Sequence, residues 1–301
     1  MRLTEGRYIS LLTDFGFKRI FGSDINKDLL IDFLNSLFNG EQVVKEVTFL
    51  KSEHVGDVYA ERKAIFDVYC ENEHGEKFIV EMQNAYQTYF KDRSLYYATF
   101  PIREQAPKGD NWNFKLQHVY VVALLNNDMN EEAFSHESIN HDVGLLDKQT
   151  HKVFNNKLTF KYVEIARFNK DINELETNFD KWLYVLRNLS RLDNQPTYLR
   201  NEVFNRLFSQ AEIARFDKKE LKAYEDSLKA YRDIKNSLDT AKEEGRAEGL
   251  AEGLEKGLEK GRAEGASEKA LTIAREMLAL NISVDTIKKV TGLTDNEIHD
   301  L

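Results

Sequence analysis

The apolar residues of the first half of the chain change from helical spacing to strand-like patterns. In Lys27–Asn39, leucine and phenylalanine recur every three or four positions, which predicts a helix. Val43–Leu50 is rich in β-branched residues and predicts a strand. Lys63–Glu71 and Lys77–Gln83 predict two more strands, and Gly75 between them supplies the turn. We therefore expect the last two strands to form an antiparallel hairpin.

A helix and a buried strand are expected to follow this hairpin. Asn84–Gln105 has a helical pattern that ends near Pro107. Gln117–Leu125 is almost continuously apolar, as in a strand that is buried on both faces. The order of helix, three strands, helix and strand indicates an α/β core.

The second half of the chain is dominated by helical patterns, over Asp171–Leu192 and Tyr198–Asp239. Glycine then recurs at every fourth position, at 245, 249, 253, 257, 261 and 265. A glycine in a helix interior costs about 1 kcal/mol relative to alanine, whereas pairs such as Glu252 and Lys256 return a few tenths each. Two interpretations follow: the glycines permit the close approach of another helix, or the segment is a flexible spacer.

The C-terminal residues predict a small helical element. Glu268–Leu280 is amphipathic, and residues 283–301 predict two short helices around Gly292, with a capping box of Thr294 and Glu297. This hairpin resembles a helix-turn-helix, and its apolar seam is expected to consist of Ile287, Val290, Leu293 and Ile298. Acidic residues outnumber lysines in the hairpin, so it would repel the phosphates on which DNA affinity depends. We expect a helical cap or a protein-interaction element rather than a DNA reader.

Composition narrows the class of protein. Hydrophobic residues make up 42% of the chain and charged residues 31%, enough for one sizeable core with a more polar part attached. The single cysteine, Cys70, excludes an intrachain disulfide and a cysteine zinc cluster. No apolar run approaches the ~20 residues that span a bilayer, and the first ten residues do not resemble a signal peptide. A cytoplasmic protein with no membrane partner is expected.

The formal net charge of −9 limits any nucleic-acid function. Proteins that bind phosphates through their overall charge are usually basic. Binding of DNA by this chain would have to depend on a local patch or on a bound metal.

Two carboxylates interrupt the predicted hairpin strands. Asp67 is expected to share a strand face with Lys63 and Tyr69, and Glu81 to share one with Gln83. The opposite face of the first strand is expected to hold Ala64, Phe66, Val68 and Cys70. Two carboxylates brought together in apolar strands repel each other unless a positive ion lies between them, and Mg²⁺ is often held by one or two carboxylates. The alternative is that each strand has one solvated face and that both acids lie outside.

Four stretches of the chain carry a resemblance to a known family. They are TDFGFKRIFGSDINKDLLIDFLNSLF at 13–38, ERKAIFDVYCENEHGEKFIVEMQ at 61–83, FKDRSLYYATF at 90–100 followed by LQHVYVVALLN, and FKYVEIARFNKDINELETNFDKWLYVL at 160–186. The spacing from Asp67 to Glu81 and Gln83 is similar to the PD-(D/E)XK nuclease signature. Together with the glycine-repeat tail, the four stretches resemble the recombination-promoting nuclease (Rpn) and transposase branch of that superfamily.

The resemblance implies a fold and an activity. The fold would be a restriction-endonuclease-like α/β core, a central mixed sheet flanked by helices, with a long helical C-terminal extension. The activity would be the metal-dependent hydrolysis of DNA phosphodiesters, linked to recombination or mobile elements, with Mg²⁺ or Mn²⁺ as cofactor. Asp67 and Glu81 match the two metal-binding acids.

Gln83 departs from the motif, which usually has a lysine at this position. Glutamine carries no charge and can only orient water through hydrogen bonds. Lys63 and Lys18 are the candidates for the missing charge; the alternatives are an exposed edge lysine and a surface pair of Lys18 with Asp14. Because of this departure, a catalytically inactive module with a nuclease fold, binding DNA or protein, is the second interpretation.

Arg93 and Tyr97 lie one helical turn apart in the third matching stretch, so they could face a DNA phosphate or brace their helix on the sheet. Residues 217–280 are expected to make the protein a homo-oligomer. We expect four regions: a nuclease-like domain at 1–195, a helical region at 196–240, a glycine-repeat helix or spacer at 241–267, and a small helical element at 268–301.

Overall fold

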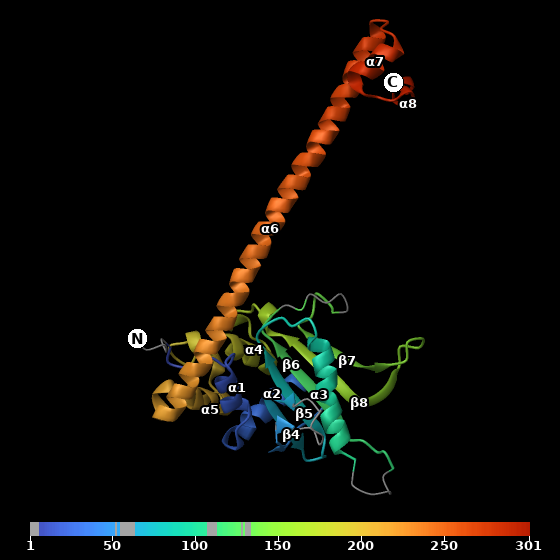
Figure 1. Cartoon of the computed structure of the whole chain (residues 1–301). Coiled ribbons are helices and arrows are strands. Elements are labelled where there is room, and N and C mark those ends of the chain that lie inside the picture. The colour runs from blue at the N-terminus through green and yellow to red at the C-terminus, as the bar shows by residue number, and fades with distance from the viewer. Residues whose placement is uncertain (1–5, 52, 55–63, 107–112, 128, 130–133) are drawn as a thin grey trace. The chain divides into compact units, whose positions relative to one another are not determined.

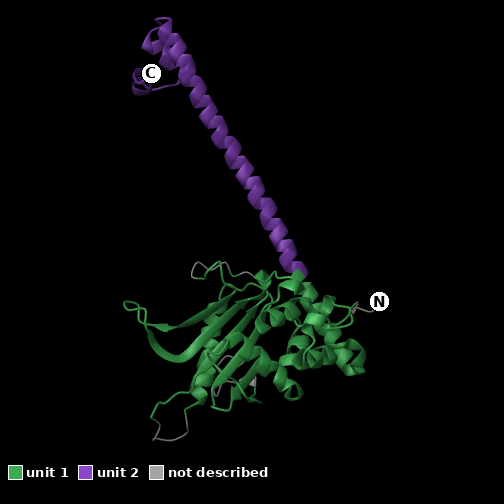
Figure 2. Ribbon diagram, turned by 180° about the vertical axis from the view of Figure 1, so that it is seen from behind, with its two compact units in different colours: residues 1–235 green, residues 236–301 purple. Residues whose placement is uncertain are grey.

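The computed structural model describes residues 6–51, 53–54, 64–106, 113–127, 129 and 134–301. The chain forms two compact units, Met1–Lys235 and Asn236–Leu301 (Figure 2). Among the described residues, no helix is both long and apolar enough to cross a membrane.

A six-stranded mixed sheet is the centre of the first unit, in the order β1-β4-β5-β6-β8-β7. The strands are β1 (Val47–Phe49), β4 (Val68–Asn72), β5 (Lys77–Gln83), β6 (Val119–Leu125), β7 (Asn140–Leu146) and β8 (Val153–Glu164). β5, β6 and β8 are parallel to one another, and the outer pairings are antiparallel. A separate pair, β2 (Glu53–His54) and β3 (Ala64–Ile65), is antiparallel.

Helices cover both faces of the sheet (Figure 1). On one face lie α1 (Asp14–Phe21), α2 (Lys27–Phe38), α4 (Asn178–Asn188) and α5 (Glu202–Ala211), whose apolar side chains form the larger core with β4, β5 and β6. The opposite face packs against α3 (Phe90–Glu104) in a second core. Short 3₁₀ turns occur at Asp24–Asn26, Ile165–Arg167, Ile172–Glu174, Leu189–Arg191, Thr197–Leu199 and Ile213–Arg215. The mixed sheet flanked by helices confirms the predicted fold class.

The start of α1 is fixed by local contacts that are visible in the sequence. The Thr13 hydroxyl accepts a hydrogen bond from the Gly16 N–H at 3.1 Å, as an N-cap does. Gly16 has no room for a side chain, because an added Cβ would lie 2.1 Å from the Ser10 carbonyl oxygen. The cap and the glycine together set where α1 begins.

Several predicted boundaries are wrong. The strand predicted at Val43–Leu50 is only β1, and the helix predicted at Asn84–Gln105 begins at Phe90, after a turn. Within the helix predicted at Asp171–Leu192, only α4 is α-helical. The helix predicted at Tyr198–Asp239 is interrupted at Glu212, whose backbone is extended, so that α5 and α6 are separate helices. β7 and β8 were not among the predicted strands.

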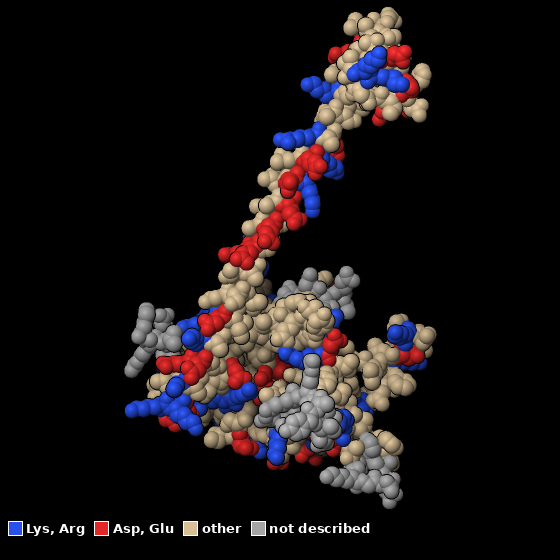
Figure 3. Space-filling view, viewed as in Figure 1, with Lys and Arg blue, Asp and Glu red and all other residues tan. Residues whose placement is uncertain are grey.

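The second unit contains most of a 62-residue helix, α6 (Lys218–Ala279), whose first part belongs to the first unit. The glycine repeat is helical throughout, and acidic side chains run along much of this helix (Figure 3). Apart from the chain neighbours and the helix's own backbone, no described atom lies within 4 Å of a Cβ built on any of these six glycines.

The end of α6 packs against a hairpin of two short helices, α7 (Val284–Thr291) and α8 (Asp295–His299). The predicted Thr294–Glu297 capping box is present. The small core consists of Ala274, Ile287, Leu293 and Ile298. Val290 was predicted to belong to this seam but is 62% exposed, because its position on α7 faces away from α6.

Candidate functional site

Asp67 lies at a bend rather than within a strand. The predicted strand Lys63–Glu71 is interrupted at this residue, and β4 begins at Val68. The bend shifts the alternation of side chains, so that Phe66 joins Tyr69 in the core under α3, while Val68 lies in the opposite core. The predicted shared face of Phe66 with Val68 is therefore wrong.

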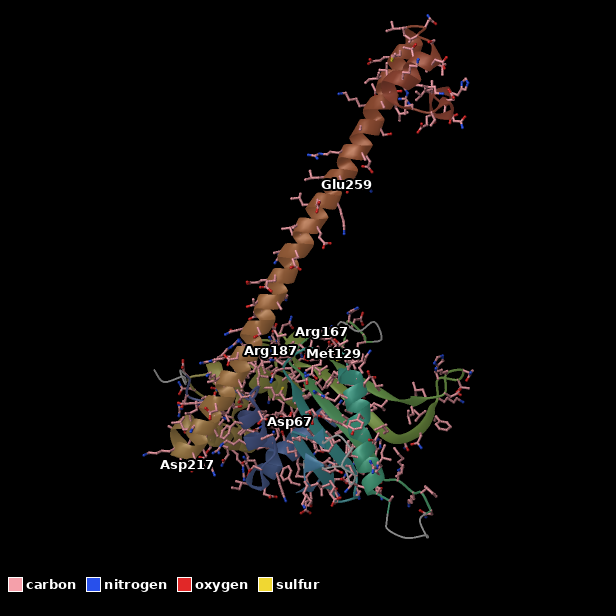
Figure 4. The ribbon with its side chains drawn as sticks, in the orientation of Figure 1. Asp67, Met129, Arg167, Arg187, Asp217 and Glu259 are labelled. Atoms are coloured by element: carbon pink, nitrogen blue, oxygen red, sulfur yellow. The ribbon has the colours of Figure 1, made fainter. Side chains whose placement is uncertain are left out.

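Glu81 lies on β5, on the same face as Ile79, and is buried. Its carboxylate Oε1 accepts a hydrogen bond from the Asp67 backbone N–H at 3.1 Å. In return, Asp67 Oδ2 accepts one from the backbone N–H of Met82 at 2.9 Å. These two reciprocal bonds bring both carboxylates together in the middle of the first unit, where Figure 4 labels Asp67.

The positive charges near the two carboxylates do not offset the effect of burial on their pKa values. Burial and the neighbouring Asp67 raise the pKa of Glu81 to about 8. Burial also raises the pKa of Asp67, although the Met82 N–H, Lys18 and Arg93 act in the opposite direction. A divalent cation would remove this penalty, and carboxylate oxygens are the ligands that Mg²⁺ prefers.

Within the described part of the chain, the site offers a divalent cation two carboxylates, those of Asp67 and Glu81. This part of the chain contains no group of three or more His, Cys, Asp or Glu side chains arranged to hold a metal. The donor set still fits Mg²⁺, which usually completes its coordination with water and substrate phosphate.

Lys18 reaches the pair from α1. Its Nζ lies 2.6 Å from Asp14 Oδ1 and 3.7 Å from Asp67 Oδ1. Burial lowers the pKa of Lys18, but Asp14, Asp67 and Glu81 outweigh it and leave the pKa raised. Lys18 is therefore a charged ammonium that pairs with Asp14 and also lies beside Asp67.

Arg93 approaches the same pair from α3, through Gln83. The buried Gln83 side chain accepts a hydrogen bond from Arg93 Nη2 at 2.6 Å and donates one to the Ala85 carbonyl. Gln87 Oε1 accepts a second bond from Arg93 Nη1 at 2.6 Å. The guanidinium lowers the pKa of both Asp67 and Glu81 through its charge. Gln83 itself is uncharged, but its hydrogen bond keeps the positively charged Arg93 near the carboxylates.

Tyr97 contacts both Arg93 and Phe66, the residue before Asp67. Its ring packs edge-on against Phe66, with centroids 5.1 Å apart, and Arg93 lies over it at 5.6 Å. Two roles were considered for Arg93 and Tyr97: contact with a DNA phosphate, or bracing of their helix against the sheet. The contact of Tyr97 with Phe66 is of the bracing kind. Lys63, the other candidate cation, lies outside the described residues.

Sequence reasoning missed the asparagines that join the site to its surroundings. Asn84 Nδ2 donates to the Leu12 carbonyl at 2.7 Å, which ties the end of β5 to the segment before α1. The Asn126 N–H donates to the Gln83 carbonyl at 2.8 Å. Both follow directly after a strand, and that position was the available signal, because polar residues at the carboxyl ends of parallel strands commonly line sites.

Two family profiles match the chain. A profile of the PD-(D/E)XK nuclease family transposase matches residues 11–241, and a profile of the Rpn/YhgA-like nuclease family, C-terminal HTH domain, matches residues 267–301. No curated protein and no solved structure matched the chain. The first match covers well over half of the chain and includes Asp67, Glu81 and Gln83. The chain therefore belongs to the PD-(D/E)XK nuclease family transposases.

Proposed function

We propose that this protein is a metal-dependent DNA endonuclease, with Asp67 and Glu81 holding Mg²⁺ or Mn²⁺. Nucleases of the PD-(D/E)XK family generally use divalent metal ions. The observation that carries the proposal is the pair of joined, partly or fully buried carboxylates between Lys18 and Arg93. A role in recombination or in mobile elements and a cytoplasmic location are part of the same proposal.

Each residue of the proposed site has its own role. When bound, a divalent cation supplies charge that stabilises a reacting phosphate and makes water more acidic. Lys18 and Arg93 place positive charge on two sides of the pair, from α1 and α3. Both can attract the DNA phosphate and stabilise negative charge that develops on it. Gln83 holds Arg93, and its second amide hydrogen remains able to orient water.

Plasmid nicking in Mg²⁺ tests the proposal. Asp67→Asn and Glu81→Gln should each reduce the nicking rate at least about 100-fold, since each removes one of two anionic ligands. Lys18→Met should reduce it about tenfold, because one of two nearby cations remains. Calorimetric titration with Mn²⁺ should show binding to the wild type that Glu81→Gln abolishes.

Matched controls are available in the same unit. Asp24→Asn removes an acid whose side chain is 78% exposed, and Lys27→Met removes a lysine of similar exposure to Lys18. Both should nick at the wild-type rate. Equal nicking by wild type and Asp67→Asn would sink the site assignment.

The second candidate function is a binding module without catalysis. It is favoured by Gln83, whose amide already contacts Arg93 and the Ala85 carbonyl in place of a motif lysine. The same Mn²⁺ titration separates the two functions. A protein that binds DNA but neither binds Mn²⁺ nor nicks plasmid would be the module.

We also propose that α6 makes the protein a homo-oligomer. Leu250, Leu254 and Leu258 are 75%, 64% and 54% exposed and lie next to the glycine stripe. A second α6 could approach closely along the glycines and cover these leucines. Two sites would then be available for the two DNA strands.

A further inference from the structure

A cavity of about 710 Å³ lies between the turn after β5 and the first half of α3. Three of its lining residues are tyrosines: Tyr86, Tyr89 and Tyr96. We call this cavity the tyrosine pocket. Its volume falls in the range of roughly 300–1,000 Å³ that is usual for ligand sites.

The tyrosines of the pocket present their rings to solvent. Tyr86 is 51% exposed, Tyr89 75% and Tyr96 42%. Tyr96 is held by an edge-on contact with Phe100, at 5.1 Å between ring centroids. Three large rings gathered around one opening are costly to leave in water, which is typical of a surface that binds something.

The tyrosine pocket is linked to the carboxylate site through Arg93. Arg93 lines the pocket and donates hydrogen bonds to Gln83 on β5 and to Gln87 in the pocket wall. Tyr86 follows Gln83 by three residues, so their Cα atoms are at most about 11 Å apart. A strand of DNA with a phosphate at Asp67 and Glu81 would place a neighbouring nucleotide at the tyrosines.

The chemistry of the pocket suits a base better than a phosphate. Its one arginine, Arg93, is held by Gln83 and Gln87 beside the carboxylates, and its one acid, Asp92, would repel a further phosphate. The remaining lining groups are aromatic faces together with the polar side chains of Gln87 and Thr88. Flat rings with a few hydrogen-bonding groups beside them bind nucleobases by stacking.

We propose that the tyrosine pocket binds an unpaired base of the DNA strand that is to be cut. The inference rests on the proposed nuclease function and names its substrate class: single-stranded DNA, or duplex with locally unpaired bases. In a fully paired duplex both faces of each base are covered by its neighbours, so the tyrosines gain a stacking partner only where a base is free.

Binding of a labelled oligonucleotide to the full chain in EDTA tests the proposal without cleavage. Tyr89→Ala and Tyr86→Ala should each weaken binding of the single strand about tenfold and change binding of the same sequence as duplex less than about twofold. Tyr89→Phe and Tyr89→Trp keep a ring and should bind as the wild type does. The control is Tyr198→Ala, which removes a tyrosine of 63% exposure outside the pocket and should have no effect.

A single abasic nucleotide moved along the strand gives a second readout. At one or two positions it should weaken binding by the wild type, and at those positions Tyr89→Ala should lose nothing further, since base and ring act as one contact. Unchanged single-strand affinity in Tyr86→Ala and Tyr89→Ala would overturn the proposal. So would equal losses for single strand and duplex, or weaker self-association of Tyr89→Ala with unchanged DNA affinity, which would indicate a protein occupant.

The outcome is separable from that of the nuclease proposal. If the wild type nicks plasmid in Mg²⁺ while the tyrosine variants bind DNA normally, the site stands and the pocket assignment fails. If the wild type never nicks but single-strand binding depends on Tyr89, the pocket stands and the catalytic proposal fails.

Discussion

The two units of the chain are stabilised by different means. The first unit has two apolar cores on either side of its sheet, and these position the carboxylates. In the second unit, every residue of α6 from 236 to 269 is exposed. Most helices in proteins are stable because one face packs against something, and this stretch also carries six glycines. From this difference we expect the proposed chemistry to depend on the first unit, and the proposed assembly to depend on α6.

Removal of α6 beyond residue 240 should have the largest effect on assembly and little effect on the fold of the first unit. Light scattering should show an oligomer for the full chain and a monomer for residues 1–240. The melting temperature of the first unit should stay within about 2 °C, because the lost residues contribute nothing to either core. A monomer in both cases would end the oligomer proposal.

Glycine substitution sharpens this test without shortening the chain. Alanine at Gly249, Gly253 and Gly257 should stabilise a lone helix by about 1 kcal/mol per site. If another helix packs on the stripe, the same change should instead weaken association. Stronger helicity together with unchanged association would favour the spacer interpretation.

A smaller effect is expected in the pH dependence of the first unit. Because the pKa of Glu81 is about 8 in the folded chain and near 4.5 when unfolded, the folded state holds a proton that the unfolded state has lost between these values. Without metal, the free energy of unfolding should therefore fall as the pH rises from about 4.5 to 8, by up to about 5 kcal/mol, and level off above.

Urea unfolding at pH 5 and pH 8.5 in EDTA measures this slope. Glu81→Gln should flatten it, and Mg²⁺ should stabilise the wild type at pH 8.5 but not the variant, because metal binds the deprotonated pair. Asp24→Asn serves as the control and should keep the wild-type slope. An identical slope in wild type and Glu81→Gln would contradict the assignment of this titration.

The smallest effect is expected from the hairpin of α7 and α8. Although this region matches an HTH profile, α8 carries Asp295 and Glu297 and would repel phosphate. Deletion of residues 282–301 should change DNA affinity less than about threefold and leave its salt dependence unaltered. A large loss of affinity with a shallower salt slope would show that the hairpin reads DNA.

Local patterns predicted most of the sheet centre but not its outer part. The hairpin of β4 and β5 and the buried strand β6 are confirmed, since their apolar residues are contiguous or alternate. β7 and β8 were both missed. In β7 and in the first part of β8, apolar residues such as Val143 and Phe154 are exposed. Without a buried face, no regular alternation marks a strand.

The sequence singled out the acids of the candidate site and named Lys18 and Arg93 as candidates, but it did not predict the contacts that these two cations make. Asp67 and Glu81 stand out because carboxylates are rare in apolar segments. The approach of Lys18 to Asp67 joins residues 49 positions apart and depends on how α1 packs. The hydrogen bond from Arg93 to Gln83 depends on the turn between β5 and α3. The sequence had predicted that the helix begins within this turn. Such contacts follow from tertiary structure, which spacing alone does not encode.

The anchoring of α1 has a consequence for protein synthesis. The Ser10 N–H donates to the Tyr224 hydroxyl, the Phe15 N–H to the Ser227 hydroxyl, and Arg19 pairs with Glu220 at 2.6 Å. These contacts join the two ends of the first unit, so they form only after residue 227 has left the ribosome. Until then α1, which carries Lys18, lacks these three contacts. A nascent chain therefore carries both acids before the first unit can close, and we expect the proposed activity to appear only after residue 227 has been translated.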